Sequence, residues 1–162
     1  MTMKKYRDNG AIGALLDEYE KSILELSDLL DSVNESQLIQ IIDHKTEDED
    51  CRSIQTIITH VVYAGYNYTD TIRNKYVGEV DYKKKELKST IEEYRSGLID
   101  MFAYAERLFI ENHNLSIEDG NIHNKMHVSW GQSYDIEQLM EHAIVHVLRH
   151  RRQIERFLLR LN

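Results

Sequence analysis

Apolar side chains recur every three or four residues in four long stretches of the chain, with charged side chains between them. The stretches cover residues 12–30, 54–72, 87–109 and 136–161. This spacing places the apolar side chains on one face of an α-helix. Four amphipathic helices bury these faces most simply against one another, so the pattern predicts an all-α protein with the architecture of a four-helix bundle.

The links between these helices predict how the helices are ordered. Residues 76–86 form a short link, so we expect the second and third helices to be neighbours. Residues 31–51 hold a short helical turn over residues 36–42 and then an acidic run that should be solvated. No internal repeat and no domain boundary interrupt the pattern, so we expect residues 1–162 to form a single domain.

The longest link, residues 111–135, precedes the last helix. Residues 114–117 and 125–130 have the composition of short extended pieces. Links of this length are often functional. Asp135, with Gln138 three residues later, resembles a capping box and predicts where the last helix begins.

The composition narrows the class of protein. The chain contains no proline, which favours long unbroken helices. Its formal net charge of -8 repels phosphate backbones, so we expect no nucleic acid partner. No segment approaches the ~20 apolar residues of a membrane span, and the first residues lack the apolar run of a signal peptide, so we expect no membrane partner. Cys51 is the only cysteine and cannot form an internal disulfide, which favours a cytoplasmic location.

Histidines interrupt the apolar face of the last predicted helix. His146 and His150 are four residues apart, so they point about 40° from each other, in a direction shared with Ala143 and Gln153. Two imidazoles at this spacing can bind one divalent ion. His142 points about 60° away from their mean direction, so we expect it to flank the pair.

A third histidine lies in the second predicted helix. His60 is next to Val61 on the inward face, and it would complete a site of three imidazoles if the two helices face each other. Tyr63 and Asn67 follow on the same side of this helix, where they could contact a ligand or hold the histidine in place. A second explanation stays open, in which tyrosines or carboxylates satisfy these imidazoles in a core without metal.

The remaining candidates are weaker. His123 and His127 lie in the long link, where we expect ordinary loop residues, with a part in a lid as the alternative. His44 and His113 flank loops, so we expect surface positions for these two. Cys51 lies at the start of the second predicted helix, two to three turns away from His60, and this distance favours a structural role.

Two stretches resemble the DinB family of damage-inducible, DinB-like four-helix proteins. They are "SIQTIITHVVYAGYN" and "HVLRHRRQI", and the order of helices and links extends the resemblance over nearly the whole chain. The resemblance implies a four-helix bundle in which His60, His146 and His150 hold a divalent transition metal, and it implies a homodimer. The family pattern has glycine where this chain has Arg152, which affects the expected packing and not the ligands.

Some relatives in that family are transferases that use a low-molecular-weight thiol such as bacillithiol or mycothiol. The resemblance therefore implies a metal-dependent S-transferase or hydrolase acting on a small molecule. Imidazole binds Zn²⁺, Ni²⁺ and Fe²⁺ alike, so the three histidines do not identify which metal is bound. Since no inward carboxylate is evident as a base, we place thiol transfer ahead of hydrolysis. The alternative is a non-catalytic bundle that binds a metal or ligand and works by association.

Overall fold

The computed structural model describes residues 6–161, and most of these residues are helical. The elements are α1 (Gly10–Leu29), η1 (Leu30–Ser32), α2 (Glu35–Ile39), η2 (Glu49–Cys51), α3 (Ile54–Tyr76), α4 (Ile91–Glu111), η3 (Ile122–Asn124), β1 (Met126–His127), β2 (Ser133–Tyr134) and α5 (Ile136–Leu161). Strands cover only four described residues, so the predicted all-α class is confirmed.

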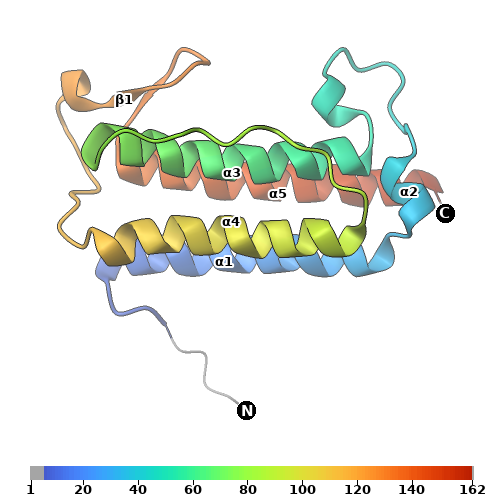
Figure 1. Cartoon of the computed structure of the whole chain (residues 1–162), viewed down its shortest axis with the longest axis horizontal. Helices are drawn as coiled ribbons and strands as arrows, with labels where there is room; N and C mark the ends of the chain where they lie inside the picture. Colours follow the sequence, from blue (N-terminus) through green and yellow to red (C-terminus); the bar gives the residue numbers. More distant parts are fainter. Residues whose placement is uncertain (1–5, 162) are drawn as a thin grey trace.

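The four long helices lie side by side along the length of the molecule (Figure 1). Helix α1 packs against α4 and α5, and α3 packs against the same two helices. Their apolar faces meet in one continuous core, in which Leu26, Ile57, Leu98 and Ile154 are fully buried. Burial of these faces is the main source of stability for such helices. The single domain predicted for residues 1–162 includes residues 1–5 and 162, which lie outside the described part of the chain.

Short polar motifs fix where the helices begin. The Asp135 side chain accepts a hydrogen bond from Gln138 N at 2.9 Å, and Gln138 Oε1 accepts from Asp135 N at 3.2 Å, which confirms the predicted capping box. Ser53 and Thr90 cap α3 and α4 in the same way. Each box satisfies backbone N–H groups that the first helical turn leaves without partners.

The link between α3 and α4 is longer than predicted. Helix α4 begins at Ile91, so Leu87 belongs to the link, where 62% of its surface is exposed. Because residues 77–90 run back along the whole length of α3, the two helices start at the same end of the molecule (Figure 1). The two helices pack directly against each other, as predicted.

The segment before α5 contains one antiparallel pair of strands. Met126 pairs with Tyr134 and His127 with Ser133. The turn between them includes Gly131 at φ +86, a backbone conformation that favours glycine. Strand β1 lies inside the predicted extended piece 125–130, whereas residues 114–117 do not form a strand.

Two features of the surface bear on partners. The aromatic residues Tyr66 and Phe109 are buried in the core, so neither is available for a dimer contact, while Trp130 keeps 42% of its surface exposed. Among the residues that the structure describes, no helix has the length and apolar character needed to cross a membrane.

Candidate metal centre

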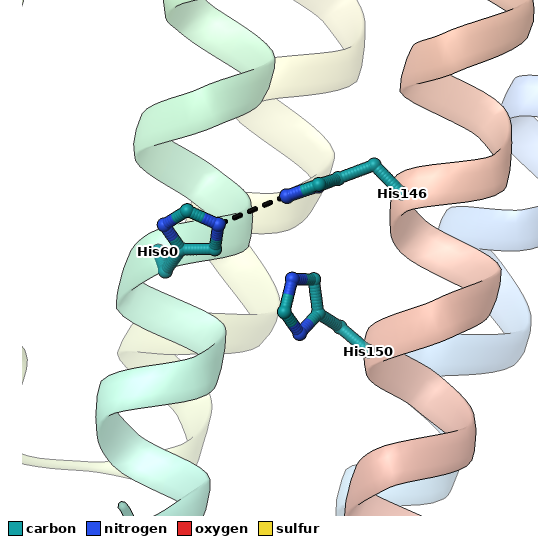
Figure 2. A group of neighbouring side chains, drawn as sticks. All are labelled: His60, His146 and His150. Atoms are coloured by element: carbon teal, nitrogen blue, oxygen red, sulfur yellow. Dashed lines mark hydrogen bonds between the residues drawn. The ribbon is translucent and has the colours of Figure 1, made fainter. Parts of the chain in front are cut away.

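Three imidazole rings meet between α3 and α5. His60 comes from the second turn of α3, and His146 and His150 come from successive turns of α5 (Figure 2). The ring centroids are separated by 4.8 Å for His60 and His146, 5.0 Å for His60 and His150, and 4.5 Å for His146 and His150. The three rings therefore form a nearly equilateral triangle, and the predicted convergence of these residues is confirmed.

Ring nitrogens point into this triangle. His60 Nε2 lies 2.9 Å from His146 Nε2, and one nitrogen of His150 is directed toward the other two rings (Figure 2). One ligand atom from each histidine lies within 4.8 Å of the others. Three nitrogens bound to one four-coordinate Zn²⁺ are about 3.3 Å apart. The separations in this site, 2.9 Å between His60 Nε2 and His146 Nε2 and at most 4.8 Å within the group, lie on both sides of that value.

The outward nitrogens of two rings have other partners. His60 Nδ1 lies 3.1 Å from Asp50 Oδ2, and His150 Nδ1 lies 3.0 Å from Gln153 Oε1. Oxygens of this kind accept hydrogen bonds, so each ring donates from Nδ1 and keeps its lone pair at Nε2. Protein groups of this kind commonly orient histidines that bind metals.

Burial keeps these imidazoles neutral. Burial, together with the nearby His150 and His60, lowers the pKa of His146 to about 2. Burial also lowers the pKa of His150 to about 4, against the opposing effect of its Gln153 contact. The pKa of His60 is lowered by burial, although the Asp50 carboxylate raises it. Neutral imidazoles are the form that binds metals, so none of the three has to give up an imidazolium charge before it binds at neutral pH.

The donor set fits a transition metal with open coordination positions. The outward nitrogens of His60 and His150 are satisfied by protein groups, but the inward nitrogens meet only one another in the described part of the chain. No carboxylate or thiol of residues 6–161 joins the three histidines in this group. Three neutral ligands are typical of sites that leave room for a water or a substrate.

The other predicted residues lie around the triangle or away from it. The His142 ring is 6.3 Å from that of His146, and its Nδ1 lies 3.4 Å from the Tyr134 hydroxyl, so it flanks the site as expected. Tyr63 lines a cavity with Lys83 and Asp100, and Asn67 lines another with His127 and Trp130. Contact of Tyr63 or Asn67 with a bound molecule stays a prediction.

The loop histidines lie on the surface. His44 and His113 are exposed, as the sequence predicts, and the loop residues His123 and His127 are exposed as well. His127 Nδ1 lies 3.3 Å from the Ser133 hydroxyl across the strand pair. These residues stand outside the group of three.

The sequence did not reveal three neighbours of the site. Asp50 belongs to the acidic run that was expected to be solvated, yet it contacts His60. Cys51 is also closer than predicted, because its Sγ lies 3.8 Å from the same Gln153 oxygen that contacts His150. The Tyr68 ring packs edge-on against His146, with centroids 5.7 Å apart. Of these three, only Tyr68 could be placed near the site from the sequence, because it belongs to the inward face of α3.

No family model matches this chain, and no curated protein or solved structure matches it either. The resemblance to the DinB family therefore stays a prediction that rests on the quoted residues. The assignment of a candidate site rests on the geometry of the three histidines.

Proposed function

We propose that the protein is a metal-dependent enzyme whose long helices form a DinB-like four-helix bundle. His60, His146 and His150 hold one divalent transition metal, and the reaction takes place on a small molecule beside it. The observation that carries the proposal is the triangle of neutral imidazoles with converging nitrogens. Such a site supplies a Lewis acid that lowers the pKa of a thiol or water bound next to it.

Thiol transfer is the reaction we favour. The S–H bond of a low-molecular-weight thiol breaks, sulfur forms a bond to an electrophilic carbon, and the leaving group departs with its electron pair while the proton passes to solvent. This step needs no protein carboxylate as base, and no carboxylate of the described residues belongs to the group of three. The Asp50 carboxylate contacts the outward side of His60, away from the converging nitrogens.

A combined binding and activity assay tests this proposal. The protein is loaded with Zn²⁺ or Ni²⁺, thiols are titrated by calorimetry, and conjugation to electrophiles is compared with ester and amide hydrolysis. We expect thiol binding and conjugation, both lost in His146→Ala. Hydrolysis alone, without thiol binding, would favour a hydrolase. No activity with any thiol or metal would leave the non-catalytic bundle as the better description.

The setting of this activity is part of the same proposal. We infer a cytoplasmic protein, since the single Cys51 leaves no internal disulfide. We also infer a homodimer from the family resemblance. Light scattering should then give twice the 19.2 kDa of one chain, and a mass of one chain would contradict the dimer.

A further inference from the structure

The Asp50 carboxylate joins two segments that are distant in sequence. Its Oδ2 lies 3.1 Å from His60 Nδ1, and its Oδ1 accepts a hydrogen bond from Lys85 Nζ. Asp50 belongs to η2, which precedes α3, and Lys85 belongs to the link that runs back along α3 (Figure 1). Both oxygens of the carboxylate are therefore engaged, one by a cation and one by a histidine.

The contact with Asp50 determines where His60 carries its proton. An ionised carboxylate only accepts hydrogen bonds, so His60 Nδ1 must donate. The neutral ring then has its lone pair at Nε2, which lies 2.9 Å from His146 Nε2. A hydrogen bond between the two Nε2 atoms requires that one of them carry a proton. Since His60 Nε2 has the lone pair, His146 Nε2 is the donor when no metal is bound.

We propose that Asp50, held by Lys85, is a positioning residue that locks His60 in the tautomer whose Nε2 lone pair faces the metal site. This inference rests on the proposed function, because it assigns a role toward the same metal. A carboxylate in this place also orients the ring and makes its other nitrogen a stronger ligand for a metal. Gln153 contacts His150 in the same way with a neutral oxygen.

Metal affinity gives the first test. Asp50→Asn keeps the shape of the side chain and removes its charge, and we expect it to weaken Zn²⁺ binding about 10–100-fold in a competition with a chelator. Glu49→Gln is the matched control, because it removes the same charge from a neighbouring side chain that is 84% exposed and pairs with Arg52. Equal affinity for Asp50→Asn and the wild type would overturn the proposal.

The position of the proton gives a second test that needs no metal. Nitrogen NMR of the metal-free wild type should show His60 protonated at Nδ1, and Asp50→Asn should shift protons toward Nε2. A wild-type His60 protonated mainly at Nε2 would overturn the proposal even if the protein binds Zn²⁺. A wild type without affinity for any divalent metal would overturn the proposed function, and with it the role of Asp50 toward a metal.

A double-mutant cycle tests the part played by Lys85. If Lys85 acts through the carboxylate, Lys85→Gln should weaken Zn²⁺ binding in the wild type and have little further effect in Asp50→Asn. Equal losses in both backgrounds would show that Lys85 acts independently, which would overturn its part in the proposal.

Discussion

At the scale of single residues, the buried imidazoles make stability depend on pH. An unfolded histidine binds a proton near pH 6.5, whereas the folded pKa values of His146 and His150 are about 2 and about 4. Below pH 6.5 the unfolded chain therefore takes up protons that the folded chain does not. The free energy of unfolding must fall as the pH falls through this range.

We expect the metal-free protein to lose about 2 kcal/mol of stability between about pH 7 and about pH 5.5. Urea unfolding in the presence of a chelator measures this loss at each pH. The double variant His146→Gln with His150→Gln is the control, and its stability should change much less over the same range. An equal pH dependence in the wild type and the control would show that these imidazoles are not held neutral.

The ligand assignment makes a second prediction at this scale. Replacing His146 or His150 with alanine removes a converging nitrogen, so occupancy by Zn²⁺ after reconstitution should fall strongly. Replacing His142 removes only a flanking ring, whose Nδ1 contacts the Tyr134 hydroxyl, and should have a weak effect. Elemental analysis of the reconstituted variants distinguishes the two cases, and an effect of His142→Ala as large as that of His150→Ala would contradict the assignment.

At the scale of the helices, the sequence predicted which residues lie inward but not the paths between the elements. The spacing of apolar residues was sufficient to predict the four long helices, and the Asp135 motif was sufficient to predict where the last one begins. The start of α4 at Ile91 was missed because Leu87 continues the apolar spacing, while the Thr90 and Glu93 side chains supply the actual cap. Asp50 was missed because spacing along a chain does not show that a loop folds back onto a helix.

The contact between α3 and α4 depends on a glycine. A Cβ atom on Gly65 would lie 1.9 Å from Met101 Sδ and 2.9 Å from the Tyr19 hydroxyl. Met101 is fully buried, so its side chain cannot turn into solvent. A side chain at position 65 must therefore push neighbouring core residues apart.

We expect Gly65→Ala to lower the free energy of unfolding by about 1–3 kcal/mol, because it overpacks the core. Gly97→Ala is the control in α4, since the nearest side-chain atom to its new Cβ lies 3.9 Å away on Val62. This control should stabilise the protein by up to about 1 kcal/mol, as alanine suits a helix better than glycine. Urea unfolding of both variants checks the result, and similar effects would contradict the close packing of α3 on α4.

At the scale of the whole molecule, the proposed metal site links two helices that are distant in sequence. His60 lies on α3, whereas His146 and His150 lie on α5, so only the folded chain brings the three nitrogens together. A ligand that binds only the folded state stabilises it by mass action. Metal binding should therefore raise the stability of the whole protein.

We expect free Zn²⁺ at about 100 times its dissociation constant to add about 2.7 kcal/mol of stability. For a chain of this size the midpoint of thermal unfolding should rise by about 5–10 °C. Differential scanning calorimetry measures the shift, with His150→Ala as the control that should show little change. A shift of the same size in the control would place the metal elsewhere on the protein.

The central claim is that three histidines of this chain share one metal ion, and anomalous diffraction from crystals of the Zn²⁺-loaded protein tests it most directly. We predict one strong peak per chain, about 2.0–2.1 Å from a ring nitrogen of each of His60, His146 and His150. An absent peak at this position, or a peak bound instead by the surface pair His123 and His127, would contradict the claim.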